Sequence, residues 1–172
     1  MLTFLVSAVA LSAVGIMSST AQSAPEEREL KDEIPKHLPI QVKVKNLKDK
    51  NWTGELEVEV KNTGEKPIYF LYLTLFFVDV KMENGDDIGF PLMYGRWQLT
   101  SPDNRPTPDD VPIRPGETYI FKAPKSLANN WEKLRVRRNF GHPKKIGLRF
   151  HHLSHGDGTG FQHTGGRPYP RA

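Results

Sequence analysis

The sequence predicts an all-β protein, an antiparallel β-sandwich of about six to eight strands. Three observations lead to this prediction. Residues 55–61 (ELEVEVK) alternate strictly between polar and apolar side chains, which is typical of a strand with one buried face. After a turn at residues 62–67, residues 68–80 form a long and almost wholly apolar strand. Short apolar runs separated by Gly, Pro and Asn recur along the rest of the chain.

The other expected elements follow from the same patterns. Further strands are expected at residues 40–45, 88–93, 116–122 and 145–154. Residues 101–115 hold five prolines and are expected to form a loop, because proline cannot donate to a sheet ladder. The only expected helix is a short one at about residues 126–134, capped by Ser126, with Trp131 and Leu134 on one face.

The chain of 172 residues is expected to begin with a secretory signal peptide over residues 1–23. Residues 2–17 are uncharged and mostly apolar, and small residues follow, so cleavage is expected after Ala21 or Ser23. An uncleaved anchor is the alternative, but the run is shorter than the roughly 20 apolar residues that span a bilayer. We therefore expect a secreted or periplasmic bacterial protein with no stable membrane span after cleavage.

The expected mature chain has a flexible charged leader over residues 24–38 and one sandwich domain over residues 39–172. Its C-terminal tail is expected to be irregular from about residue 161. About 150 residues suit one domain that buries roughly 70% of its unfolded surface. The chain has no cysteine, which excludes disulfides, thiolate catalysis and cysteine-ligated metals.

Three motifs resemble the immunoglobulin-like FxLyD-type module of bacterial secreted proteins. They are a turn at residues 58–64 (VEVKNTG), the close of the long strand in Phe77-Val78-Asp79, and residues 113–117 (IRPGE) before a later strand. The likeness covers about residues 54–123, and residues 89–112 are an insertion relative to the pattern. The resemblance implies an immunoglobulin-like sandwich that is non-catalytic and extracellular, and it supplies no functional residues.

A histidine-rich segment near the C-terminus is a candidate metal site. Its potential ligands are His151, His155, Asp157 and His163. Strand alternation would place His151 and His155 on one face and His152 on the other. No recognised metal-ligand spacing is present, so the competing interpretation is histidines near a hairpin whose tight turn is formed by residues 156–160.

A basic segment is a candidate site for polyanions such as surface polysaccharide or lipid phosphate. Its cations are Lys133, Arg135, Arg137 and Arg138, and they alternate with apolar residues as on one exposed strand face. The competing interpretation is a solvated face. Nucleic acid is not an expected partner of an exported protein.

The strand over residues 68–80 is apolar on both faces, although a sandwich needs only one apolar face. Phe70, Tyr72 and Phe76 form a possible interaction surface on the second face. The cover is either a partner chain or the 89–112 insertion together with the leader, and we expect cover from the same chain and a monomer. Tyr94, Trp97 and Tyr119 are further aromatic residues that could line a sugar- or peptide-binding surface.

No catalytic arrangement emerges from the sequence. The chain lacks a Gly-x-Ser-x-Gly motif, and its paired carboxylates, Asp86-Asp87 and Asp109-Asp110, are adjacent in turns rather than spaced for acid–base work. We expect an exported, non-catalytic binding or structural module without a cofactor, whose ligand is an unidentified protein or glycan. A metal-binding protein or metal-dependent enzyme is the first alternative, and a polyanion-binding envelope protein is the second.

Overall fold

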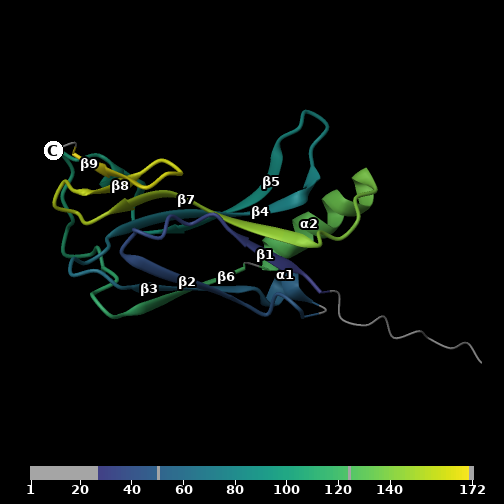
Figure 1. Cartoon of the computed structure of the whole chain (residues 1–172), viewed down its shortest axis with the longest axis horizontal. Helices are drawn as coiled ribbons and strands as arrows, with labels where there is room; N and C mark the ends of the chain where they lie inside the picture. The colour runs from purple at the N-terminus through teal and green to yellow at the C-terminus, as the bar shows by residue number, and fades with distance from the viewer. Residues whose placement is uncertain (1–26, 50, 124, 171–172) are drawn as a thin grey trace, which may run out of the picture.

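The structure, a computed structural model, describes residues 27–49, 51–123 and 125–170. Nine strands in this part of the chain form two sheets that lie one above the other (Figure 1). The strands are β1 (Glu29–Asp32), β2 (Ile40–Lys45), β3 (Glu57–Asn62), β4 (Phe70–Lys81), β5 (Asp87–Tyr94), β6 (Thr118–Lys122), β7 (Lys145–Ser154), β8 (Gly160–Gln162) and β9 (Arg167–Tyr169). The larger sheet has the order β5-β4-β7-β8-β9 with β1 also on β7, and the smaller sheet has the order β2-β3-β6. The all-β sandwich predicted from the sequence is confirmed.

The core lies between the two sheets, and β4 is its centre. The inward side chains of β4 are Leu71, Leu73, Leu75 and Phe77, all at most 1% exposed. They face Val58 and Val60 of β3, whose alternation with outward glutamates follows the predicted pattern. Because β4 has β5 on one side and β7 on the other, its backbone is hydrogen-bonded along both edges.

Three helical segments accompany the sheets within the described ranges. They are α1 (Trp52–Glu55), the 3₁₀ turn η1 (Trp97–Thr100) and α2 (Lys125–Arg138). The predicted helix at residues 126–134 is present but extends to Arg138. The basic residues 133–138, interpreted as a strand face, therefore form the end of α2. An alternating pattern of six residues covers less than two helical turns, so by itself it does not distinguish a strand from a helix. The helical residues that precede it extend α2 through this segment.

The predicted flexible leader over residues 24–38 is wrong for its described part. β1 pairs in parallel with β7, with Glu29 opposite Lys145 and Asp32 opposite Leu148. Ile34 and Leu38 are 7% and 4% exposed, so this segment belongs to the core. Its many charges suggested a solvated segment. Apart from Arg28, which is 8% exposed, these charged side chains reach the surface, while two apolar side chains anchor the segment. The predicted signal peptide, residues 1–23, lies outside the described residues.

The predicted irregular tail from residue 161 is also wrong. β8 and β9 extend the larger sheet beyond β7, and Tyr169 is 6% exposed. Strands of three residues are too short to show a period in the sequence. β8 pairs with residues 152–154 of β7, on the same edge that β1 occupies at residues 145–148, because β4 takes the other edge. Figure 1 shows β8 and β9 at one end of the molecule and the helices α1 and α2 at the other. No helix in the described ranges is long and apolar enough to cross a membrane.

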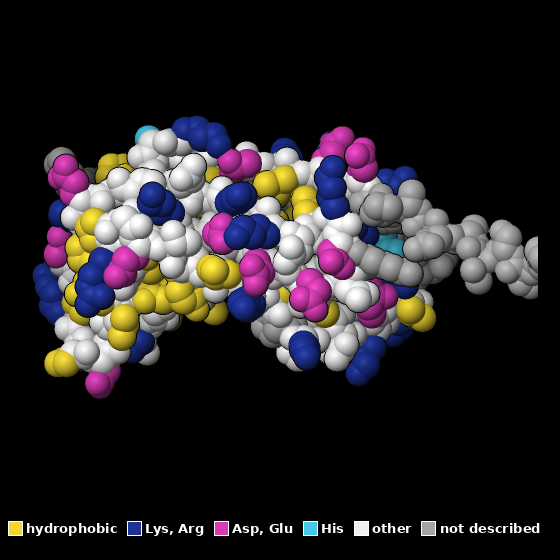
Figure 2. All heavy atoms as spheres, turned by 90° about the horizontal axis from the view of Figure 1, so that it is seen from below, with side chains coloured by type: hydrophobic (Ala, Val, Ile, Leu, Met, Phe, Trp, Pro, Cys, Tyr) yellow, Lys and Arg dark blue, Asp and Glu magenta, His cyan; other side chains and the backbone are white. Residues whose placement is uncertain are grey.

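The outer face of the smaller sheet is covered by charges. Glu59 of β3 pairs with Lys45 of β2 at 2.5 Å, and Glu57 pairs with Lys122 of β6 at 3.5 Å. Figure 2 views the molecule from this side and shows cationic and anionic side chains interspersed over it, with hydrophobic side chains gathered toward one edge. The two sheets therefore differ in the chemistry of their outer faces, because the larger sheet carries aromatic residues there.

Candidate functional site

The outer face of β4 is apolar, as the sequence predicted, but most of it is buried. Phe70 and Phe76 are 1% and 2% exposed, and Tyr72 between them is half-buried. Phe70 and Phe76 are therefore not the exposed interaction surface that the sequence suggested. The described chain itself supplies their cover, and the residues of that cover reach the solvent.

Phe70 is covered by side chains from two separate segments. The indole of Trp97 in η1 lies 5.6 Å from the Phe70 ring in an edge-on arrangement, and His152 of β7 lies 5.8 Å from it. Trp97 also contacts the ring of Tyr72 at 6.2 Å. η1 belongs to the 89–112 insertion, so the insertion covers this part of the strand. Trp97 itself is 58% exposed, so the apolar layer continues to the surface.

A bulge in β7 decides which way its histidines point. Tyr72 of β4 is opposite His152 and Leu73 is opposite Phe150, which leaves His151 as an extra residue between them. His151 stacks on Tyr72 at 4.5 Å and 22°, and His152 packs on Phe70. Both histidines therefore contact the outer-face residues of β4, and the prediction of opposite faces is wrong. The sequence cannot show a bulge, because one extra residue leaves the pattern on either side intact.

His151 and His152 are each held by a hydrogen bond. Nε2 of His151 lies 2.9 Å from Oγ1 of Thr74, and Nε2 of His152 lies 2.9 Å from the hydroxyl of Tyr169. Burial lowers the pKa of His151, and the nearby Arg149 cation lowers it further. Burial also lowers the pKa of His152, to about 4. Both rings are therefore neutral at neutral pH.

Phe76 is covered by a guanidinium group. The Arg149 guanidinium lies 4.1 Å from the centre of the Phe76 ring, a cation–π arrangement. Nε of Arg149 donates to Glu33 at 2.9 Å, and Nη1 donates to Asp87 at 3.1 Å. No side chain at residue 147 crowds this ring, because that position is glycine.

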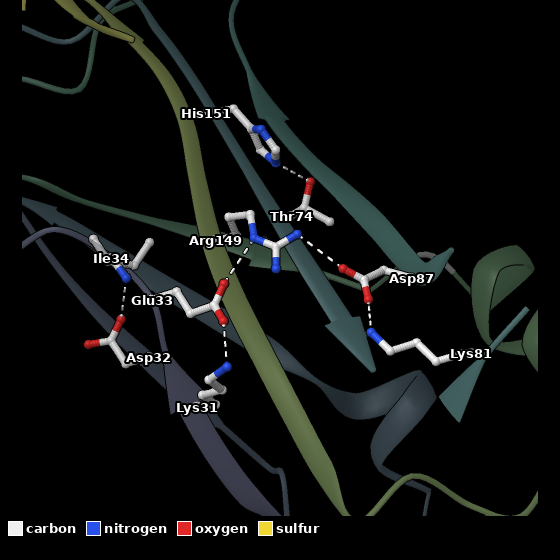
Figure 3. A network of polar contacts seen from close by, with 9 residues as sticks. All are labelled: Lys31, Asp32, Glu33, Ile34, Thr74, Lys81, Asp87, Arg149 and His151. Carbon is white, nitrogen blue, oxygen red and sulfur yellow. Dashed lines mark hydrogen bonds and ion pairs between the residues drawn. The ribbon is translucent and has the colours of Figure 1, made fainter. Parts of the chain in front are cut away.

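Two lysines extend this contact into a row of five charges, which we call the ion chain: Lys31, Glu33, Arg149, Asp87 and Lys81. Lys31 pairs with Glu33 at 2.8 Å, and Lys81 donates a hydrogen bond to Asp87. Figure 3 shows Arg149 between the two carboxylates, with a lysine beyond each and with His151 beside Thr74. The hydrogen bond from Lys31 lowers the pKa of Glu33, and that from Lys81 lowers the pKa of Asp87. Both carboxylates therefore stay ionised at neutral pH.

The exposed part of this face forms what we call the outer platform: Tyr72, Met93, Trp97 and His151. Met93 is opposite Tyr72 in the pairing of β4 with β5 and is 53% exposed. The sequence singled out Trp97 and Tyr72 separately but did not join them, and it missed Met93 and the ion chain. Alternation along β5 was the signal for Met93, because every second residue of that strand points outward.

The residues of the candidate metal site do not come together. Nδ1 of His155 lies 3.0 Å from the carbonyl of Pro67, and Asp157 accepts a hydrogen bond from Lys66 at 2.8 Å. His163 lies in the turn between β8 and β9 at a φ of 63°, and His151 is part of the outer platform. Among the described residues, no three His, Asp or Glu side chains are placed to hold a metal ion.

The candidate polyanion site is also dispersed. Arg135 donates to Glu132 at 2.9 Å, and Arg138 donates to Glu83. Because α2 turns by about 100° per residue, Lys133, Arg135 and Arg137 do not form one row as they would on a strand. Two of the four predicted cations are thus paired with carboxylates, and the helix directs the set to different sides.

The outer platform and the ion chain lie next to one another on the outer face of the larger sheet. They offer exposed aromatic and thioether surface beside hydrogen-bonding groups with fixed positions. The carboxylates are each bonded to two cations, so neither is poised as an acid or base in the described structure. No family model, no curated protein and no solved structure matches the chain. The geometry of this face is therefore the guide to function.

Proposed function

We propose that this chain is an exported, non-catalytic β-sandwich module that binds a ligand through the outer platform and the adjoining ion chain. The observation that carries this proposal is the exposure of Trp97 and Met93, at 58% and 53%, on a layer of buried aromatic side chains. Trp97 adjoins Tyr72 by ring contact and Met93 adjoins it across the pairing of β4 with β5, and clustered exposed hydrophobic side chains mark sites of interaction more often than isolated ones do. Trp and Met are also enriched in binding interfaces.

The rigidity of the platform supports a binding role. His151 is stacked on Tyr72 and hydrogen-bonded to Thr74, and Trp97 rests on Phe70 and Tyr72. Side chains that are already held in place lose little conformational entropy when a ligand binds.

Two sequence features support the other parts of the proposal. The uncharged apolar segment at residues 2–17, followed by small residues, supports export. The resemblance of residues 54–123 to FxLyD-type modules supports a non-catalytic extracellular role. Export is tested by expressing the full chain in a bacterial host and measuring the mass of the product by mass spectrometry. We expect a periplasmic or secreted protein that begins at Gln22 or Ala24, and an unprocessed cytoplasmic product would contradict export.

Binding is tested with the purified protein on panels of immobilised glycans and of immobilised peptides. We expect retention on one panel that is lost in Trp97→Ala and kept in Ile120→Ser. Ile120 is a matched control, because it is an exposed hydrophobic residue, 39% exposed, on β6 of the opposite sheet. Retention on neither panel, or retention that Trp97→Ala leaves unchanged, would overturn the proposed binding surface.

A further inference from the structure

We propose that the ligand of this surface is an uncharged glycan, a chain of neutral sugar rings that lies along β4 and β7 from the outer platform to the ion chain. This inference rests on the proposed function and adds the chemical class of the ligand. Three properties of the surface carry it: the mixture of aromatic and hydrogen-bonding groups, the internal pairing of its charges, and its length.

The mixture of groups matches the two sides of a sugar ring. A pyranose presents C–H groups on its faces and hydroxyls around its rim. Trp97 offers exposed aromatic surface to the C–H groups, and Tyr72 lies next to it. Thr74 and His151, which adjoin Tyr72, offer a hydroxyl and a neutral imidazole to the hydroxyls.

The pairing of charges favours an uncharged ligand. Arg149 is bonded to both Glu33 and Asp87, and each carboxylate has a second cation, Lys31 or Lys81. An anionic ligand would have to displace a carboxylate from Arg149, and a cationic ligand would have to displace a lysine or the arginine. Sugar hydroxyls can bond to the remaining lone pairs and N–H groups of the same side chains without breaking any ion pair.

The length of the surface suits more than one sugar ring. Tyr72 and Phe76 are four residues apart on β4, which corresponds to about 13 Å along an extended strand. The platform marks one end of this distance, and Arg149 over Phe76 marks the other. A globular protein partner typically needs about 800 Å² on each side with an apolar centre. Here charged groups interrupt the apolar area after the platform, which favours a narrow ligand.

Trp97 provides a direct probe of occupancy. The chain has three tryptophans, and Trp52 and Trp131 are 2% and 1% exposed. Trp97 is therefore the residue that acrylamide quenches most, and a glycan stacked on it must reduce that quenching. The reduction is absent in Trp97→Phe, which keeps an apolar ring over Phe70.

The deciding experiment presents the wild-type protein to a panel of neutral, uronic-acid and phosphorylated glycans and to a peptide panel. We expect neutral glycans to bind and to shield Trp97. Raising the ionic strength from about 0.1 M to about 1 M, which shortens the screening length from about 10 Å to about 3 Å, should change the affinity less than about twofold. His151→Ala and Trp97→Phe should each weaken binding about tenfold, whereas Ile120→Ser should not.

The outcomes separate the two proposals. Binding of peptides but not glycans, abolished by Trp97→Ala, would overturn the glycan assignment and leave the binding function intact. Strongly salt-dependent binding of acidic glycans would overturn the claim that the ligand is uncharged. Binding that no platform variant changes would overturn both. Circular dichroism of each variant shows that a loss of binding does not result from unfolding.

Discussion

Asn62 closes β3, and its side chain links two distant parts of the chain. It is fully buried, and Nδ2 donates to the carbonyls of Lys66 and Ile113, both at 2.9 Å. Its Oδ1 accepts from the amide of Gly64 at 3.0 Å. The sequence identified this residue as the start of a turn, whereas the structure has it as the last residue of β3, before the bend at residues 64–66. Its bond to Ile113, 51 positions away, is a tertiary contact that turn chemistry does not show.

We predict that Asn62→Ala lowers the free energy of unfolding by about 2 to 3 kcal/mol, because buried carbonyls lose their donor. Urea unfolding measures this, with an unchanged dependence on denaturant as the sign that only stability has changed. Asn84→Ala is the control, since Asn84 is exposed in the β4–β5 turn. Equal stability of the two variants would contradict the linking role of Asn62.

Gly147 allows Phe76 to lie against β7. A Cβ at this position would lie 2.2 Å from Cζ of Phe76, whose ring is buried beneath Arg149. We predict that Gly147→Ala destabilises the fold by about 1 to 3 kcal/mol, as overpacking of a filled core does. Gly141→Ala is the control, because a Cβ there meets no described atom within 4 Å. Thermal unfolding that does not distinguish Gly147→Ala from wild type would show that the Phe76 ring can move.

His152 makes the stability depend on pH. Burial lowers its pKa in the folded state to about 4, below the value of about 6.5 in an unfolded chain. Above pH 6.5 the ring is neutral in both states, so its full contribution is present. As the pH falls from about 6.5 to about 4, only the unfolded state gains the proton, and stability is lost.

We predict that wild type loses stability through His152 between pH 7 and pH 4. His152→Gln should lose less stability than wild type over this pH range. His142→Gln, at an exposed loop position, should lose as much as wild type. Chemical unfolding at a series of pH values measures the difference. An identical pH dependence in wild type and His152→Gln would refute the assignment.

At the scale of elements, β1 is the clearest addition that the structure makes. The amides of Glu29 and Glu33 donate to the carbonyls of Lys144 and Leu148, both at 2.9 Å. Glu33 also belongs to the ion chain, so the segment predicted as a flexible leader supplies part of the candidate site. The part of the 89–112 insertion that follows β5 similarly supplies Trp97 through η1. Neither segment shows strand periodicity over any useful length, and the position of each is set by the residues that it covers.

We predict that a chain beginning at Lys36 is less stable than one beginning at Glu27 by about 2 kcal/mol or more, because it lacks the buried Ile34 and the β1 ladder. Amide hydrogen exchange should show faster exchange at residues 145–148 in the shorter chain, with residues 58–60 of the other sheet as the internal reference. Equal exchange at 145–148 in both chains would mean that β1 does not stabilise β7.

At the scale of the whole molecule, the second apolar face of β4 no longer requires a partner chain. η1, β7 and the ion chain cover Phe70 and Phe76. We predict that light scattering gives the mass of a single chain, and that Phe70→Asp lowers the unfolding midpoint rather than changing the mass. A dimer that Trp97→Ala or Met93→Ala dissociates would identify a second copy as the occupant of the outer platform.

The sequence by itself determined the sandwich, the strands β3 and β4, the Pro-rich loop and a helix after β6. These features repeat a local period or contain turn residues, and local preferences suffice to specify them. The sequence also showed that β4 is apolar on both faces, although a sandwich needs only one apolar face. Only the tertiary structure decided what covers that face, because the cover comes from η1, a bulged β7 and the region around β1. These contacts join residues 25 to 116 positions apart, and no local pattern records such a separation.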